Sequence, residues 1–407
     1  MRCFGSLVIV VCLALMGIAP ASAESADRTV VVSSLEDAGP GTLRSALEGQ
    51  RPFDTITFDP VVFPPDRRVR IRIQSTLPGL NVGNVSIDAS DSWVVLDGRD
   101  IAEDWTHGLQ IVSDANTIQG LGVSHFPGAG IAISESSGNL VGGDRSVGAG
   151  PYGQGNLLTR NSHMGIGLWN GASGNEVRGN LVGADVSGKE ARGNGNGIAV
   201  NEGASDNTIG PDNIIARNRH AGVYFGDRAT VGNTATRNSI HHNGGAGIVV
   251  ARSAHEGVVP PTLLAFDLEA GTLVGATCAG CTVEVYSDRT HEGAAYEGSV
   301  TADEQGRFSL QVDGPFSGPE LTAITIDPDR GTSEFSLRTI GPNGRTLIQR
   351  GNEAPVTQIK SLESSELADN RMGAQFPGFG PVETYDYEIY PRGVKQARVA
   401  IEPVEPE

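Results

Sequence analysis

Several residue types are scarce in this sequence, and each shortage argues against a class of protein. Basic residues are outnumbered by acidic ones, 30 against 48, and the net charge is −18. Because a nucleic-acid-binding protein needs a basic face for the phosphates, this charge argues against nucleic acid as a partner. Aromatic residues make up only 5% of the chain, which is not the composition of a compact helical enzyme. No Gly-rich stretch precedes a helix as a phosphate-binding loop would, so nucleotide binding is also disfavoured.

Long apolar runs are missing except at the N-terminus. Residues 7–19 are apolar, Arg2 precedes them, and Pro20 and Ala21-Ser22-Ala23 follow. A charged start, a short apolar core and an A-x-A site are typical of a secretory signal peptide. The run is shorter than the roughly 20 residues of a membrane-spanning helix, and an uncleaved anchor is the alternative. We therefore predict a signal peptide over residues 1–23, cleavage near Ala23, and a secreted protein, extracellular or at the cell surface, with no transmembrane segment.

Cysteine is scarce as well. Two of the four cysteines lie in the predicted signal peptide, so the mature chain holds only Cys278 and Cys281. A four-thiolate zinc site would need a second pair. In an oxidising compartment this pair is predicted to form a tight structural disulfide rather than a redox motif or half of a metal site.

Glycine, in contrast, is abundant, and it marks an internal repeat. The 55 glycines are roughly twice the usual share of about 7%. Five segments share one frame, in which an Asn opens the segment and a Gly followed by Ile or Val closes it. The openers are Asn116, Asn139, Asn175, Asn207 and Asn233, and the closers are Gly130, Gly165, Gly197, Gly222 and Gly247. Gly and Asn tolerate the dihedral angles of tight corners, so the frame is typical of a solenoid.

Aliphatic residues recur at fixed places within this frame. Val177, Val182 and Ile198, for example, have counterparts at the same places in the other segments. The pattern predicts three short strands per repeat, wound around an apolar interior, with coils about 4.8 Å apart. Equivalent Asn side chains would then hydrogen-bond along the stack. A helical repeat would instead show apolar residues at spacings of three and four.

Two insertions lengthen the repeats at corners. They cover residues 142–155 and 183–195, and both are Gly-rich and polar. Loops that leave a repeat protein on one side often form its binding face. Both insertions are therefore predicted to be loops and candidate parts of a binding surface.

The segment before the repeats resembles a known family. The run TVVVSSLEDAGPGTLRSALEG, Thr29–Gly49, contains a DxGPGxLR turn at Asp37–Arg44. It resembles the N-terminal portion of bacterial right-handed parallel β-helix repeat proteins of the pectate-lyase-like superfamily. The resemblance extends over residues 29–251 and implies the fold and its handedness. It implies little about function, because the superfamily includes lyases, surface proteins and members without known activity.

A second domain is predicted after the boundary at Val258–Pro261. Alternating runs at residues 282–286 and 321–326 indicate a small antiparallel β-sandwich. The stretches CTVEVYSD, ADEQGRFSL and DPDRGTSEFS resemble bacterial immunoglobulin-like modules, which usually act as spacers or attachment modules. The predicted fold class is all-β. Its predicted domains are a parallel β-helix with an N-terminal cap over 24–255, an immunoglobulin-like sandwich over 262–340, and a tail over 341–407, either one hairpin or disordered.

The repeat frame also brings basic residues into register. The residue before the third mark of a coil, or two places after it, is repeatedly His or Arg, and Trp169 and Tyr224 flank the neighbouring strand face. The predicted glycan-binding residues are His125, Arg160, His163, Trp169, Arg217, His220, Tyr224 and His242. We expect these residues to form a basic stripe that binds an acidic glycan, more tightly below about pH 6.5 where unperturbed His is charged. The alternative is a solvated corner covered by long polar side chains.

Catalysis requires more than this stripe. The resemblance implies that a lyase would use a basic residue such as Arg160, Arg217 or His220 as the base. A hydrolase would need paired carboxylates, and no two acidic residues share a place in the frame. We therefore assign no catalytic residue, no metal ligand and no cofactor, with Ca²⁺ left open. The predicted function is a monomeric extracellular or surface protein that binds a polysaccharide or cell-surface glycan or serves as a surface-structural module. The alternative is a lyase, or less favoured a glycoside hydrolase, acting on an acidic polysaccharide.

Overall fold

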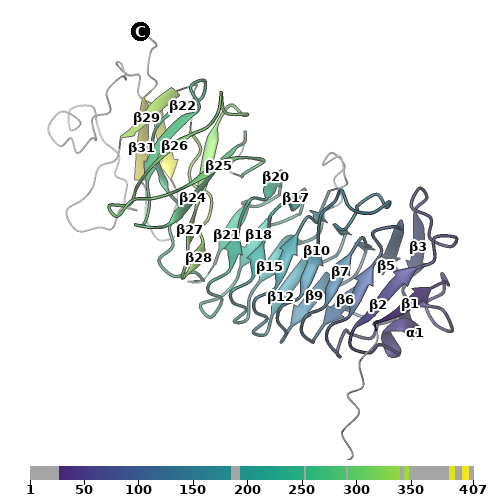
Figure 1. Ribbon diagram of the computed structural model, residues 1–407. Coiled ribbons are helices and arrows are strands. Elements are labelled where there is room, and N and C mark those ends of the chain that lie inside the picture. Colours follow the sequence, from purple (N-terminus) through teal and green to yellow (C-terminus); the bar gives the residue numbers. More distant parts are fainter. Residues whose placement is uncertain are drawn as a thin grey trace, which may run out of the picture.

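The computed structural model shows an elongated solenoid with a smaller antiparallel body at its C-terminal end (Figure 1). It describes residues 27–184, 193–251, 254–289 and 292–339, together with the backbone of three later strands. The predicted signal peptide lies outside the described residues. Within the described part of the chain, no helix is long and apolar enough to cross a membrane.

Three parallel sheets form the walls of the solenoid, which confirms the predicted parallel β-helix. Sheet A contains, in spatial order, β1 (Arg28–Val32), β2 (Asp54–Phe58), β4 (Ser86–Asp88), β7 (Thr117–Gln119), β10 (Leu140–Gly142), β13 (Glu176–Arg178), β16 (Thr208–Ile209) and β19 (Thr234–Ala235). Sheet B contains β3 (Val69–Arg72), β5 (Val94–Asp97), β8 (Gly122–Ser124), β11 (Leu157–Thr159), β14 (Leu181–Val182), β17 (Ile214–Ala216) and β20 (Ser239–His241). Sheet C contains β6 (Leu109–Ile111), β9 (Ala129–Ser134), β12 (Met164–Trp169), β15 (Asn196–Val200), β18 (Val223–Phe225) and β21 (Ile248–Val250).

The interior is a continuous stack of aliphatic side chains. Each predicted interior residue pairs with its counterpart one coil away, as Ile166 does with Ile198 and Ile198 with Val223. These side chains are buried, except that Val250 of the last coil is only partly buried. The repeat frame thus gave the correct register, because a shift by one residue would turn the aliphatic set outward.

The N-terminal end is closed by the helix α1 (Leu43–Glu48). Its first turn is capped by the hydroxyl of Thr42, and its buried residues Leu43 and Leu47 join the solenoid core. The guanidinium of Arg44 lies 2.9 Å from the carboxylate of Asp37 and fixes the preceding turn. The segment that contains α1 therefore covers the first coil.

Three ladders of buried Asn side chains run along the corners, as the sequence predicted. In each ladder the Nδ2 of one Asn donates to the Oδ1 of the Asn in the next coil at 2.9–3.0 Å. The ladders are Asn116–Asn139–Asn175–Asn207–Asn233, Asn156–Asn180–Asn213–Asn238, and Asn161–Asn194–Asn218–Asn243. In the third ladder the Oδ1 atoms of Asn194, Asn218 and Asn243 each also accept the backbone N–H of the previous Asn. The ladders therefore satisfy buried polar groups at corners where sheet pairing is interrupted.

The closing glycines of the repeats are required because the corner has no room for a side chain. A Cβ on Gly165 would lie 2.5 Å from Cγ1 of Val182 and 2.8 Å from the carbonyl oxygen of Gly197. Gly197 meets the same obstacle, with the carbonyl oxygen of Gly222 at 2.4 Å. Close packing of successive coils, rather than an unusual backbone angle, explains why glycine recurs at this place in successive coils.

The C-terminal body consists of two antiparallel sheets, as predicted. Sheet D contains β26 (Arg307–Gln311), β23 (Thr272–Ala276), β22 (Thr262–Asp267), β29 (Asn343–Leu347), β31 (Ala397–Glu402) and β30 (Tyr385–Ile389). Sheet E contains β25 (Ala295–Thr301), β24 (Thr282–Ser287), β27 (Leu321–Asp327) and β28 (Gly331–Thr332). Residues such as Leu273, Val283 and Phe308 fill the space between the sheets. Membership of this sandwich in the immunoglobulin-like class stays a prediction.

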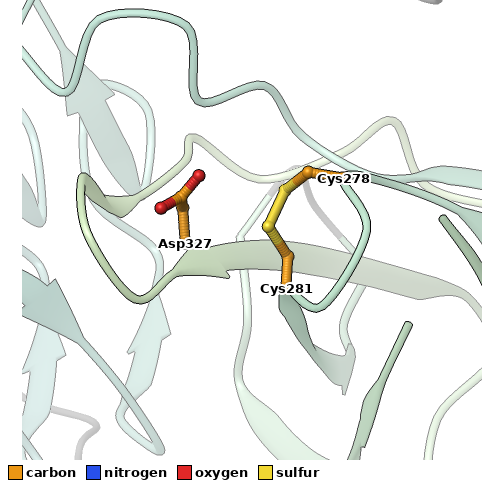
Figure 2. A group of neighbouring side chains, drawn as sticks. All are labelled: Cys278, Cys281 and Asp327. Atoms are coloured by element: carbon orange, nitrogen blue, oxygen red, sulfur yellow. A yellow bond between two sulfur atoms is a disulfide. The ribbon is translucent and has the colours of Figure 1, made fainter. Parts of the chain in front are cut away.

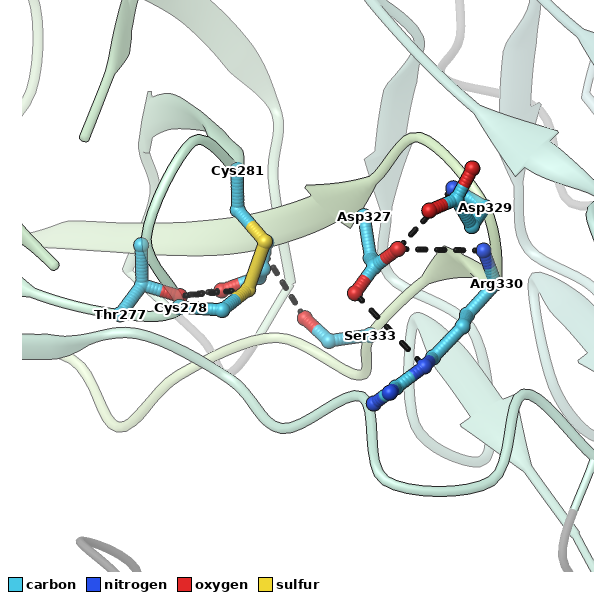
Figure 3. The surroundings of a disulfide bond; sticks show 8 residues. Thr277, Cys278, Cys281, Asp327, Asp329, Arg330 and Ser333 are labelled. Atoms are coloured by element: carbon cyan, nitrogen blue, oxygen red, sulfur yellow. Dashed lines mark hydrogen bonds and ion pairs between the residues drawn. A yellow bond between two sulfur atoms is a disulfide. The ribbon is translucent and has the colours of Figure 1, made fainter. Parts of the chain in front are cut away.

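Cys278 and Cys281 form the predicted disulfide (Figure 3). Their Cα atoms lie 5.4 Å apart, and the bond closes the turn between β23 and β24. Thr277 beside it is hydrogen-bonded to Thr325 of the neighbouring strand. The disulfide thus fixes a local turn of the sandwich.

Candidate functional site

Four residues of the predicted stripe form one column at the corner between sheets B and C. Ser124 pairs with Thr159, and Ala216 pairs with His241. The residues that follow these strand ends are His125, Arg160, Arg217 and His242. All four have left-handed backbones, with φ between 56° and 63°. In the coil between Arg160 and Arg217 the place before the ladder Asn is taken by Gly193, so the column is interrupted there.

The N-terminal part of the column surrounds one buried carboxylate. Asp97 is fully buried, and its carboxylate lies 3.2 Å from Nδ1 of His125, 2.8 Å from Arg99 and 3.6 Å from Arg70. Burial lowers the pKa of His125. The carboxylate of Asp97 opposes this shift, and the charges of Arg99, Arg160 and Arg70 reinforce it. His125 is therefore neutral at neutral pH, and the charge of this part of the stripe comes from arginine.

The C-terminal part of the column lies beside the sandwich. The Nδ1 atoms of His241 and His242 are 2.9 Å apart, so one ring must donate and the other accept. Burial and then the neighbouring His242 lower the pKa of His241, which Asp288 of the sandwich opposes and Arg217 reinforces. The stripe is thus two clusters, with the coil of Gly193 between them.

His163 and His220 occupy a second column, two coils apart. The backbone N–H of His163 donates to Gly128, and that of His220 donates to Gly195. The ring of His163 stacks against Trp105 with a centroid separation of 3.7 Å and an interplanar angle of 12°. Trp105 is 57% exposed.

His107 and Trp169 lie beside this stacked pair. Their ring centroids are 5.2 Å apart. The backbone N–H of Ala129 donates to Nδ1 of His107 at 2.9 Å, so the ring proton of neutral His107 is on Nε2. Burial, and to a lesser extent the charge of His163, lowers the pKa of His107 to about 4. We call Trp105, His107, His163 and Trp169 the aromatic cluster.

The side chains of Trp169 and Tyr224 both lie on the outer face of sheet C. A Cβ on Gly167 would meet the Trp169 ring at 1.9 Å, so the indole covers Gly167 on the outside of that strand. Tyr224 pairs with Ala199, which in turn pairs with Gly167. The structure therefore brings His163 and Trp169 together, whereas Tyr224 lies two coils away from Gly167.

Sequence reasoning missed Trp105 and His107. Both belong to the connection between β5 and β6, in a coil that precedes the regular repeat frame. The signal in the sequence is the W-x-H pair itself, at Trp105 and His107, in a chain with only three tryptophans.

A second candidate surface lies at the corner between sheets A and B. Two adjoining hollows of about 260 and 220 Å³ share Arg145 and Asp212. Arg145 comes from the first insertion, and its guanidinium donates to the backbone oxygen of Asp212 at 2.9 Å. Arg178 lines the first hollow, and Tyr296 of the sandwich lines the second. This groove has both acidic and basic walls.

A group of possible metal ligands lies in the sandwich. Within the described residues, Cys278, Cys281 and Asp327 are the one group of three or more His, Cys, Asp or Glu residues whose ligand atoms all lie within 4.8 Å of one another (Figure 2). Metal binding needs thiolates, and both sulfurs are in the disulfide. The carboxylate of Asp327 accepts the backbone N–H groups of Asp329 and Arg330 (Figure 3). These are the contacts of an ordinary Asx-type turn.

The class defined by these observations is a parallel β-helix with a C-terminal antiparallel sandwich. No family model matches the chain, and no curated protein matches its sequence. Three solved structures are similar at low identity. The pectate lyase Pel9A has a TM-score of 0.38 at 14% identity, over 53% of this chain and 54% of that one. The mannuronan C-5 epimerase AlgE6 A-module of Azotobacter vinelandii has 0.27 at 14%, over 55% and 71%. The enzymatically active domain of tailspike protein 2 of bacteriophage CBA120 has 0.25 at 11%, over 73% and 60%. The match spans about half the length of the pectate lyase.

Proposed function

We propose that the protein is an extracellular glycan-binding β-helix whose binding surface is the aromatic cluster with the adjoining arginine corner. The observation that carries this proposal is the exposed ring of Trp105, held flat against His163 at 3.7 Å. An indole fixed in one orientation and left in contact with water offers a platform for the apolar face of a sugar ring. Binding sites combine such apolar surfaces with a few fixed polar groups.

Arg160 supplies the charge beside this platform. It is exposed, lies three residues before His163, and forms no ion pair with any residue that the structure describes. Guanidinium groups bind carboxylates through two parallel hydrogen bonds. The preferred ligand is therefore a polysaccharide that carries carboxylate groups, with Trp105 contacting the ring and Arg160 the charge.

A lyase is the second candidate, and one observation favours it. The buried carboxylate of Asp97 lies 3.2 Å from Nδ1 of His125. Such a pairing orients the imidazole and leaves Nε2 as a base, and the lowered pKa of His125 keeps that nitrogen unprotonated at neutral pH. A basic residue on the next coil, Arg160, would neutralise a uronate.

Calorimetry with polygalacturonate, alginate and an uncharged galactan tests binding. The absorbance of unsaturated products in the same mixtures tests for a lyase. We expect binding to the acidic polymers, and a loss of about tenfold in affinity for Trp105→Ala and again for Arg160→Ala. The matched controls are Tyr296→Ala, an exposed aromatic on the sandwich, and Arg228→Ala, an exposed arginine paired with Glu256. Full binding by Trp105→Ala together with weak binding by Tyr296→Ala would move the site to the groove between sheets A and B. Unsaturated products that vanish in His125→Ala would establish the lyase.

A further inference from the structure

The connection between β5 and β6 holds His107 in a fixed position within the aromatic cluster. Just before this residue, the carbonyl of Thr106 accepts the backbone N–H of Gly128 at 2.8 Å. Just after it, the backbone N–H of Gly108 donates to the carbonyl of Ala129 at 3.0 Å. The imidazole lies against Gly128, where a Cβ would meet Nδ1 at 2.5 Å. The chain on both sides of His107 is therefore tied to the next coil.

The ring of neutral His107 has one acceptor nitrogen and one donor nitrogen, and the coil uses the acceptor. The backbone N–H of Ala129 donates to Nδ1 at 2.9 Å, which leaves the proton on Nε2. Among the described residues Nε2 has no hydrogen-bond partner, and it is not one of the buried atoms without a partner, so it is open to solvent. The cluster therefore contains an N–H donor of fixed tautomer that the described part of the chain leaves unused.

The surroundings of His107 keep this donor uncharged. Burial, and to a lesser extent the charge of His163, lowers the pKa of His107 to about 4. Glu103 and Asp104, earlier in the same connection, are exposed and do not contribute to this shift of the pKa. Trp169, which lies beside the ring from β12, carries no charge. Above about pH 5 the ring is therefore a neutral donor.

The donor belongs to the same surface as the exposed indole. Trp105 is two residues before His107 in the chain, and its ring stacks on His163 with a centroid separation of 3.7 Å. Both residues of the connection contact Gly128, since a Cβ there would lie 2.8 Å from the carbonyl oxygen of Trp105 and 2.5 Å from Nδ1 of His107. A ligand on the indole is therefore next to the donor.

We propose that His107 is a specificity-determining residue of this site, and that its Nε2–H donates to an uncharged oxygen, a hydroxyl or a ring oxygen, of the sugar that lies on Trp105. This inference rests on the proposed function. A donor that is already fixed loses little freedom when the ligand binds. Recognition is then divided, with Arg160 contacting the carboxylate and His107 the neutral oxygen.

The contact between His107 and Ala129 argues for an uncharged oxygen rather than a carboxylate. A carboxylate at Nε2 would favour the charged imidazole. The charged ring has a proton on Nδ1 as well, so two donors would face one another at 2.9 Å. A neutral oxygen accepts the Nε2–H and leaves the hydrogen bond from Ala129 intact.

The test removes the donor and keeps the contact to the coil. In His107→Asn the amide oxygen takes the place of Nδ1 and still accepts the N–H of Ala129, whereas no atom takes the place of Nε2. His241→Asn is the matched control, because this ring is also partly buried but lies on β20 in the last coil. Calorimetry with polygalacturonate and alginate at neutral pH should show a loss of roughly fivefold in affinity for His107→Asn, the value of about one hydrogen bond. His241→Asn should bind as the parent does.

Two readouts separate a ligand contact from a purely structural role of His107. The loss caused by His107→Asn should be the same from about pH 8 to about pH 5, because a neutral donor does not titrate in this range. In ring ¹⁵N NMR of the parent, the neutral ring should carry its proton on Nε2. With trigalacturonate or trimannuronate, the trimers of the two polymers, that proton should shift while the pKa of His107 stays below its ordinary value of 6.5.

The contrary outcomes are equally specific. A loss that grows as the pH falls, or a ligand that raises the pKa of His107, would show a carboxylate at Nε2 and overturn the proposal, as would a proton on Nδ1 of the neutral ring. Full binding by His107→Asn together with weak binding by Trp105→Ala would overturn the role of His107 and leave the proposed function in place. A parent that binds neither polymer would overturn both.

Discussion

The two ends of the Asn ladders have opposite hydrogen-bonding needs. At the N-terminal end of each ladder an amide oxygen is left over, and a backbone N–H of the preceding coil or corner uses it. The donors are Val85, Leu121 and Phe126, and the acceptors are Asn116, Asn156 and Asn161. At the C-terminal end of the third ladder the N–H groups of Asn243 are left over, and Glu292 accepts them.

This difference shows that an Asn ladder has a direction, which sets what each end requires. The first coil is covered by apolar residues of α1, such as Leu43 and Leu47. The ladders begin several coils further on, where backbone donors satisfy their first oxygens. The last coil needs acceptors as well as apolar cover. A carboxylate is the strongest acceptor that a side chain offers to N–H groups.

The largest expected effect lies in the interior that both ends share. Ile215→Asp places a charge in the fully buried stack between sheets. We expect a loss of about 3–5 kcal/mol in the free energy of unfolding, because the charge has no partner there. Urea denaturation measures it. A melting temperature within a degree or two of the parent would show that the register of the coil is wrong.

A smaller effect compares a middle rung with an end rung. Asn194→Ala removes the acceptor of two Asn161 donors and the donor to the carbonyl of Leu158, all of them buried. We expect a loss of about 3 kcal/mol, and about half of that for Asn243→Ala, whose surroundings are only partly buried. Equal losses at both positions would contradict the idea that ladder ends are satisfied separately. Chemical denaturation of both variants gives the comparison.

The disulfide separates the stability of the sandwich itself from its docking. It closes a loop of separation 3 and therefore restricts the unfolded chain little. The double variant Cys278→Ser, Cys281→Ser should lose at most about 2 kcal/mol in the free energy of unfolding. Exchange protection of β19 and β20 should be unchanged. A thiol titration that finds two free cysteines in the parent protein would rule the bond out.

The smallest effect concerns the charge at the C-terminal end. Burial raises the pKa of Glu292 above its ordinary value of 4.5, despite the hydrogen bonds from Asn243. A raised pKa favours the folded state below the ordinary value, and that contribution is lost as pH rises through the folded pKa. Glu292→Gln carries no charge, so its stability relative to the parent should rise as the pH rises above 4.5. Thermal melting of both proteins from pH 4 to pH 8 measures it. A constant difference would contradict the raised pKa.

The repeat made much of the solenoid predictable. Spacing placed Val177, Ile198 and Ile215 inside, and the same spacing placed the Asn residues in ladders, because one register serves every coil. It also placed His125 and Arg160 in one column. It could not give the charge state of His125, because Asp97 belongs to an irregular coil outside the frame.

Contacts between distant, non-repeating segments were not predictable in the same way. Asn243 and Glu292 are 49 residues apart, and neither the sandwich nor its loop has a period that would align them. The resemblance implied a spacer or attachment module and gave no indication that the sandwich shares the solenoid core through Tyr286 and Ile324. The role of Trp105 was not predicted for a similar reason, because its stacking partner His163 lies 58 residues further along the chain.

The common direction of the Asn ladders gives the solenoid an electrical polarity along its axis. In all three ladders the Nδ2 group points toward the C-terminal coil. Aligned amide dipoles add, as peptide dipoles do in a helix, and their positive end lies where the chain leaves the last coil. Two buried carboxylates, Glu284 and Glu292, stand at that end. Lengthening the solenoid by whole coils would keep this polarity, so a longer version would need hydrogen-bond acceptors at the same end.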